Sequence, residues 1–155
     1  QEIGGDTYTL TGKADRIELL NDGTLAIIDF KTGAPKSKKQ VESGLEPQLP
    51  LEAAIAEAGG FEKEGIPAKP TSEIIYVSLA PGMSTVSARN GLPVDVDPME
   101  EAKKALEGFR QLVEAYADLE QPYRSKPRVE FTWAVSDYDR LARRAEWTSD
   151  EGGEE

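Results

Sequence analysis

The sequence contains neither cysteine nor histidine among its 155 residues. Without cysteine, the chain cannot form disulfides, thiolate zinc sites or an iron–sulfur cluster of its own. Without histidine, Ser-His and Cys-His catalysis and imidazole metal ligation are excluded. Carboxylate and lysine side chains are therefore the groups left to carry chemistry.

Positive charge is also scarce, with 18 lysine and arginine residues against 29 acidic ones and a formal net charge of −11. This balance argues against tight binding to DNA or RNA by the chain alone, because such binding depends on neutralising phosphates. A nucleic-acid substrate would need help from a bound metal and a basic partner surface. There is no apolar run of about 18 residues and no signal-peptide pattern, so we expect a soluble, cytoplasmic protein.

The length fits one domain with a substantial core, which we place at residues 1–148. Residues 149–155 are acidic and glycine-rich, and we expect them to form a disordered tail. Sequence patterns predict strands at 7–20, 24–31 and 72–79 and helices at 48–58 and 98–120. Weaker patterns predict strands at 85–89 and 131–133 and a last helix at 137–147. This mixture predicts an α/β fold with a central mixed sheet flanked by helices.

Two of these helices carry apolar sides that predict core packing. In the helix at 48–58 this side consists of Leu51, Ala54, Ile55 and Ala58. The helix at 98–120 begins with Asp97 as its cap and Pro98 as its first residue. Its apolar stripe consists of Met99, Ala102, Leu106, Phe109, Val113 and Tyr116.

The first two predicted strands are joined by a tight turn. Leu20 and Thr24 flank Asn21-Asp22-Gly23, a pattern typical of a three-residue hairpin loop that closes with a left-handed glycine. A two-residue Asp22-Gly23 turn is the alternative. The choice decides which residues of the two strands face each other.

With the three-residue loop, Asp15 faces Asp29, and the alternation of side chains puts Lys31 on the same face. Facing carboxylates repel, since their Cβ atoms lie roughly 4.5–5.5 Å apart. A divalent cation such as Mg²⁺ would turn this repulsion into attraction. With the two-residue turn Asp15 would face Phe30 and the argument would weaken. The other interpretation is that these charges are a solvated strand end.

Three ordered motifs carry a resemblance to a known family. They are Gly12-Lys13-Ala14-Asp15-Arg16-Ile17-Glu18, Asp29-Phe30-Lys31-Thr32-Gly33 and Gln48-Leu49-Pro50-Leu51-Glu52. They resemble the G-x-x-D-R-I-D, D-Y-K-T-G and Q-x-x-x-Y motifs of the RecB-like branch of the PD-(D/E)XK nuclease superfamily. The likeness is greatest to the C-terminal nuclease domain of the AddB family in its alphaproteobacterial form. It implies a restriction-endonuclease-like α/β core.

By this resemblance, Asp15 and Asp29 ligate Mg²⁺ or Mn²⁺ together with the backbone carbonyl of Phe30. Lys31 orients the attacking water and stabilises charge on the phosphate, a role suited to a protonated amine. The metal acts as a Lewis acid and lowers the pKa of its bound water. Asp15, Asp29 and Lys31 are therefore the expected catalytic residues.

Further residues have supporting roles or depart from the family pattern. The resemblance implies that Gln48 and Thr32 support the site or contact the substrate. Strand alternation sends Arg16 to the opposite face, where we expect it to pair with Glu18. Glu52 stands where the family has tyrosine. The family also places a helix upstream of the first strand, so we expect this chain to be a fragment that can be inactive when isolated.

The resemblance implies a Mg²⁺-dependent DNA exonuclease module of an AddB-like subunit in double-strand break repair and recombination. Its partners would be an AddA-like helicase–nuclease subunit and a single DNA strand delivered by the helicase motor. The alternative is an inactive nuclease-fold module that docks the partner or guides DNA, favoured by the negative charge and by Glu52. A stand-alone exonuclease of the kind associated with CRISPR systems would usually carry cluster cysteines.

Overall fold

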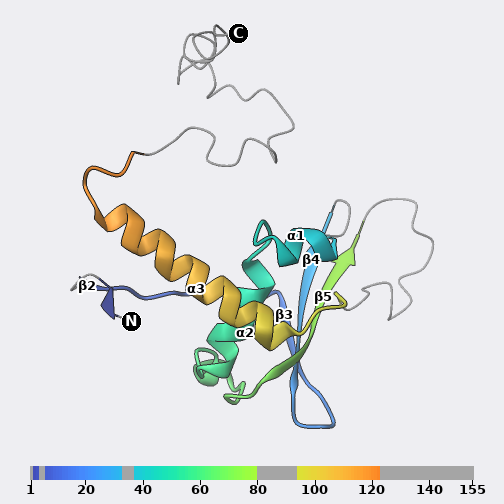
Figure 1. Ribbon diagram of the computed structural model, residues 1–155. Coiled ribbons are helices and arrows are strands. Elements are labelled where there is room, and N and C mark those ends of the chain that lie inside the picture. The colour runs from blue at the N-terminus through green and yellow to red at the C-terminus, as the bar shows by residue number, and fades with distance from the viewer. Residues whose placement is uncertain (1, 4–5, 33–36, 80–93, 123–155) are drawn as a thin grey trace, which may run out of the picture. The chain divides into compact units, whose positions relative to one another are not determined.

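The computed structural model describes residues 2–3, 6–32, 37–79 and 94–122, and the structural statements below concern these ranges. The chain divides into two units, Gln1–Ala117 and Asp118–Glu155, and the first contains all the helices and strands reported below (Figure 1). The elements predicted at 85–89, 131–133 and 137–147, and the tail at 149–155, lie outside the described residues. Within the described ranges, no helix is both long and apolar enough to cross a membrane.

The centre of the first unit is a three-stranded mixed sheet in the order β3-β4-β5. β3 (Arg16–Leu19) is antiparallel to β4 (Leu25–Lys31), and β5 (Thr71–Ser78) is parallel to β4. The first five residues of β4, from Leu25 to Asp29, are buried, because this strand has a neighbour on each side and an apolar sequence. The predicted mixed sheet is confirmed.

The long first strand predicted at 7–20 is wrong in extent. Only β3 pairs with β4, and a separate short pair forms from β1 (Glu2–Ile3) and β2 (Asp6–Thr7). Between β2 and β3 the backbone passes close to a helix: a Cβ built on Gly12 would lie 3.0 Å from Ile55 Cδ1. Glycine thus permits a close backbone approach that strand periodicity cannot reveal.

The turn between β3 and β4 is the predicted three-residue loop. Leu20 N donates to Thr24 O (2.8 Å), Gly23 N donates to Leu20 O (3.0 Å), and Gly23 has a left-handed φ of 82°. The Asp22 carboxylate accepts from Thr24 N at 2.9 Å and from Thr24 Oγ1 at 2.6 Å. These bonds lower the pKa of Asp22 below its ordinary value. The two-residue alternative is therefore excluded.

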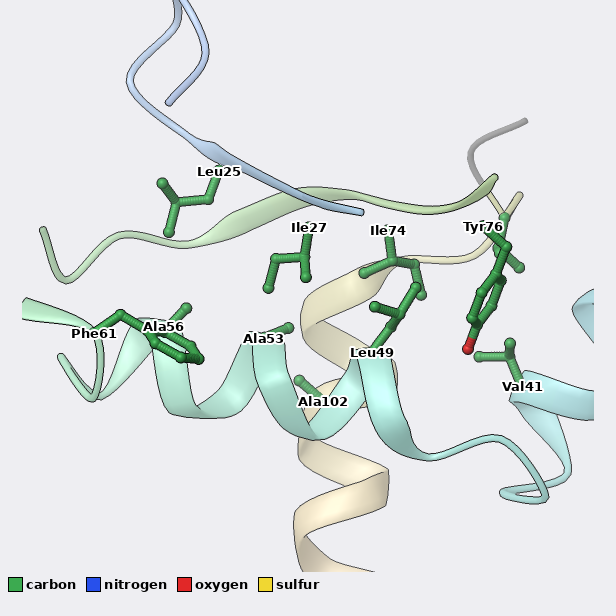
Figure 2. Packing of buried hydrophobic residues seen from close by; sticks show 11 residues of the cluster. Leu25, Ile27, Val41, Leu49, Ala53, Ala56, Phe61, Ile74, Tyr76 and Ala102 are labelled. Carbon is green, nitrogen blue, oxygen red and sulfur yellow. The ribbon is translucent and has the colours of Figure 1, made fainter. Parts of the chain in front are cut away.

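Helix α2 (Gln48–Glu57) covers one face of the sheet. Figure 2 shows Leu25 and Ile27 of β4 and Ile74 and Tyr76 of β5 pointing toward this helix. Helix α3 (Pro98–Ala117) packs against α2 and β5, while the short α1 (Lys38–Glu42) adds Val41 to the core. A 3-10 turn, η1 (Glu62–Glu64), follows α2. The sequence pattern does not predict α1.

The predicted apolar side of α2 is correct only in part, since Ala54 and Ile55 pack against the core but the most buried residues of the helix are others. Leu51, Ala54 and Ile55 are partly buried and Ala58 is exposed, whereas the buried residues of the helix are Leu49, Pro50, Glu52, Ala53 and Ala56. The sheet lies on one side of α2 and α3 on another, so apolar residues surround most of the helix and their period identifies no single buried side. Ala54, Ile55 and Ala58 instead line a cavity of about 130 Å³ together with Tyr8, Leu10, Leu106 and Phe109.

Helix α3 begins as predicted. Asp97 Oδ1 accepts from Met99 N (2.9 Å) and Glu100 N (3.1 Å), which satisfies two of the free amides at the helix start. The helix ends at Ala117, before the predicted boundary at residue 120. Ala102 of the predicted stripe is buried, and the other five stripe residues are partly buried.

Candidate functional site

A cluster of polar side chains lies at the C-terminal end of β4. Side chains alternate along a strand, so Asp29 and Lys31 continue the row that Leu25 and Ile27 begin and point toward α2. The apolar part of this row packs in the core, and the polar part meets the first turns of α2, which begins at Gln48. The same elements that build the core therefore position the cluster.

Asp29, Lys31 and Gln48 form a closed ring of contacts. Asp29 is 3% exposed, and its Oδ1 accepts from Gln48 Nε2 at 3.0 Å. Lys31 Nζ lies 2.9 Å from Asp29 Oδ2 in an ion pair and donates to Gln48 Oε1 at 3.1 Å. Among the described residues, the buried Asp29 Oδ2 has the Lys31 ammonium beside it and no further hydrogen-bond donor. That oxygen retains capacity for a cationic ligand.

The charge state of Lys31 follows from this ring. The Asp29 carboxylate raises the pKa of the Lys31 ammonium above its ordinary value of 10.5, against the opposing effect of burial. Lys31 Nζ also lies 5.9 Å from the centre of the Tyr76 ring, within reach of a cation–π contact. Lys31 is thus protonated at neutral pH, so it can donate hydrogen bonds and stabilise negative charge.

Asp15 lies one residue before β3. The ladder pairs Arg16 with Ile28, so the same register places Asp15 opposite Asp29. Asp15 is exposed, and its Oδ2 accepts from Phe30 N at 3.0 Å. A carboxylate has about four lone-pair sites, so this bond leaves Asp15 able to accept from another ligand.

The backbone carbonyl of Phe30 faces the same edge of β4 as Asp15. Lys31 O accepts from Leu79 N (2.7 Å) on the β5 side, whereas Phe30 N faces Asp15. The N–H and C=O of one strand residue point to one edge, and those of the next residue point to the other. Because the β3 ladder ends at Arg16, the Phe30 carbonyl lies beyond the last paired position.

Glu52 belongs to the cluster, although its sequence position suggested only a departure from a motif. It is 4% exposed, and its Oε1 accepts from Gln48 Nε2 at 3.1 Å. Its Oε2 is buried with no hydrogen-bond partner among the described residues. Its spacing of four residues from Gln48 could have identified it in the sequence, because this spacing puts both side chains on one side of a helix.

The pKa of Glu52 is raised above its ordinary value of 4.5, chiefly by burial. The bond from Gln48 and the charge of Lys31 act in the opposite direction, whereas the charges of Asp29 and Asp15 add to the rise. The native state therefore holds the Glu52 proton to a higher pH than the unfolded chain does. Stability must fall as pH rises through this interval, since the unfolded state releases its proton first.

Replacement of Glu52 by glutamine should remove this loss of stability at higher pH, because glutamine does not titrate. We expect Glu52→Gln to unfold at a higher temperature than wild type at pH 8, with the difference shrinking as pH falls toward 4. Thermal unfolding of both proteins across this range measures it. Glu57→Gln, at an exposed position of the same helix, is the control. A difference that does not change with pH would contradict the prediction.

The remaining predicted residues lie around the cluster. Thr32 is exposed in the bend after β4, and Gly33 lies outside the described residues. Arg16 pairs with Glu18, as predicted. The structure brings Asp29, Lys31 and Gln48 into direct contact.

The donor set fits a magnesium ion held by few protein ligands. Mg²⁺ is commonly bound through one or two carboxylates and keeps several waters. Asp15 and Asp29 supply two carboxylates at facing positions, and among the described residues the buried Oδ2 of Asp29 has only the Lys31 ammonium beside it. Among the described residues there is no arrangement of three or more acidic side chains that could hold a metal ion. Waters or substrate oxygens would complete the coordination.

A mixed sheet with flanking helices and a polar cluster at the end of its central strand defines a restriction-endonuclease-like α/β domain. The chain matches the PD-(D/E)XK nuclease superfamily over residues 1–147 and belongs to that superfamily. Its members are generally nucleases and typically use divalent metals such as Mg²⁺. The resemblance seen in the three sequence motifs is thus confirmed at the level of the PD-(D/E)XK superfamily.

Curated relatives are found in Rickettsia. An uncharacterised protein of Rickettsia typhi is 34% identical over 84 residues, which cover 54% of this chain and 10% of that protein. An uncharacterised protein of Rickettsia conorii is 41% identical over 61 residues, covering 39% of this chain and 7% of that protein. The matched part is thus about a tenth or less of each relative's length. No solved structure shows significant similarity to the chain.

Proposed function

We propose that this chain is the Mg²⁺-dependent DNA-cleaving module of an AddB-like helicase–nuclease subunit, an exonuclease of double-strand break repair and recombination. The observation that carries this proposal is the ring of Asp29, Lys31 and Gln48 at the end of β4, with Asp15 opposite. Superfamily membership supports nuclease chemistry. The AddB assignment draws support from the three motifs and from relatives in which the matched segment is a small part of a long protein.

Each residue has a defined part in the proposed phosphodiester hydrolysis. Asp15, Asp29 and the Phe30 carbonyl would hold the metal. When bound, the ion polarises a phosphoryl oxygen and lowers the pKa of its water. Lys31 orients the attacking water and stabilises charge that develops on the phosphate. Gln48 holds Lys31 and Asp29 in place.

The substrate and partner in this proposal come from the AddB resemblance, and the charge of the chain supports the need for a partner. A net charge of −11 opposes unaided DNA binding, so DNA must be delivered by a more basic surface. An AddA-like helicase–nuclease subunit that feeds a single strand to the site meets this need. We propose that Thr32, which is exposed in the bend after β4, contacts that strand.

Replacement of Lys31 by methionine tests the proposal in the whole protein that carries this chain, assembled with its partner subunit. We expect cleavage of linear DNA in Mg²⁺ to fall by roughly 10²–10³-fold, because a positioned donor to the developing charge is lost. Strand separation by the helicase should be unchanged. Lys63→Met, at an exposed position in η1, is the matched control. Undiminished cleavage would rule out the role of Lys31.

An inactive module for partner docking or DNA guiding is the second candidate. It is favoured by the acidic charge and by the lack, among described residues, of a group of three acidic metal ligands. Titration of the whole protein with Mn²⁺ separates the two functions. Saturable binding that is lost in Asp15→Ala favours the nuclease, whereas no binding by wild type favours the docking module.

A further inference from the structure

The side chain of Gln48 contacts three charged groups. Its amide nitrogen donates to Asp29 Oδ1 at 3.0 Å and to Glu52 Oε1 at 3.1 Å, and its amide oxygen accepts from Lys31 Nζ at 3.1 Å. Both amide N–H bonds and the carbonyl oxygen are therefore used. Lys31 can only donate and the carboxylates accept, so the orientation of the amide follows from its neighbours.

Glu52 accepts the hydrogen bond from the second N–H of this amide. Without an acceptor at position 52, that partly buried N–H would have no hydrogen-bond partner. The free energy of its desolvation would then not be offset. The amide could then turn away from Asp29 and Lys31 to seek water. Since Gln48 and Glu52 lie one turn apart on α2, the helix holds both at a constant separation.

Packing alone gives no reason for a carboxylate at position 52. The Glu52 side chain is buried beneath the segment before β3, where its Cγ lies 3.6 Å from a Cβ built on Gly12. Its Oε2 has no hydrogen-bond partner among the described residues, which is unfavourable for a buried carboxylate. A leucine or methionine of similar volume would fill this space without that penalty.

We infer that Glu52 is a positioning residue for the cluster. Its carboxylate accepts from Gln48 and thereby sets the amide that holds the Asp29 carboxylate and the Lys31 ammonium. This inference rests on the proposed function for its catalytic meaning, because the groups so positioned are those assigned to metal binding and to the phosphate. The part of the inference that concerns the orientation of the Gln48 amide does not depend on that function.

The experiment compares two kinds of change at position 52 in the 155-residue chain. Glu52→Gln keeps a carbonyl acceptor for Gln48, whereas Glu52→Leu removes it at similar volume. The side-chain amide signals of Gln48 are followed by ¹⁵N NMR without metal and assigned by their disappearance in Gln48→Ala. We expect wild-type-like signals in Glu52→Gln and a shift toward those of a solvated amide in Glu52→Leu.

Metal affinity gives the second readout. We expect Mn²⁺ binding to weaken by about 10–100-fold in Glu52→Leu, the usual effect of removing an outer partner of a metal ligand. Glu52→Gln should bind nearly as wild type does. Glu57→Leu, at an exposed position of the same helix, controls for a general effect of leucine on α2. If Glu52→Leu does not fold, Glu52→Met replaces it as the variant without an acceptor.

Two results would overturn the inference. One is an unchanged Gln48 amide in the folded leucine or methionine variant. The other is an equal loss of Mn²⁺ affinity in Glu52→Gln, which would show that the charge and not the accepted bond matters. If wild type binds no Mn²⁺ but the amide signals move as expected, the proposed function fails and the positioning role of Glu52 stands.

Discussion

Replacement of Asp29 by asparagine is expected to abolish saturable Mn²⁺ binding and to reduce DNA cleavage by on the order of 10³-fold. Asparagine keeps the shape of the side chain and can still accept from Gln48, but it carries no charge for a cation. A metal contributes several kcal/mol of stabilisation to the transition state, and about 4 kcal/mol corresponds to this factor. Asp29→Asn therefore tests the role of the negative charge while the shape of the side chain stays the same.

The measurement combines Mn²⁺ titration with cleavage of linear DNA by the whole protein and its partner. Asp22→Asn is the control, because Asp22 is exposed in the hairpin loop and its carboxylate bonds only to Thr24 in the described structure. The control should retain metal binding and cleavage. Wild-type Mn²⁺ affinity in Asp29→Asn would remove Asp29 from the proposed metal site.

Replacement of Leu49 by alanine is expected to lower the free energy of unfolding by about 3 kcal/mol, within the usual range for a buried leucine. Leu49 is 0% exposed and lies between α2 and the sheet, where Figure 2 shows it beside Ile74 and Ala53. It also directly precedes the buried Pro50 in the first turn of α2, so little local movement can fill the cavity.

Urea unfolding of the 155-residue chain measures this effect. Leu112→Ala, on α3 at a position that is 58% exposed, is the matched control and should change stability by less than about 0.5 kcal/mol. Equal losses in the two variants would contradict the assignment of Leu49 to the core. Because Gln48 belongs to the same helical turn, we also expect weakened Mn²⁺ binding in Leu49→Ala.

The hairpin could be predicted from sequence because its determinants are local. Glycine at position 23 adopts the left-handed conformation, and Asp22 bonds to Thr24 two residues away, so the loop length and hence the register follow from a few neighbours. That register places Asp15 opposite Asp29 before any tertiary contact is considered. The buried β4 and the start of α3 at its Asp97 cap were predictable for similar reasons.

The sequence-based predictions failed at positions where contacts between distant parts of the chain decide the structure. The segment before β3 does not extend the sheet, and its Gly12 instead lies close to the Ile55 side chain of α2. The buried side of α2 could not be read from its apolar period, since the sheet and α3 cover different sides of that helix. The motif comparison identifies Glu52 only as a departure from the motif tyrosine, although its spacing of four residues from Gln48 puts both side chains on one side of α2.

By itself, the sequence determined the types of chemistry open to this protein, the hairpin register and the superfamily motifs, because composition and short-range turn preferences carry that information. Only the tertiary structure decided that Gln48 bridges Asp29, Lys31 and Glu52. The reason is physical: these contacts depend on the packing of α2 against the sheet, which is set by buried side chains far apart in the chain.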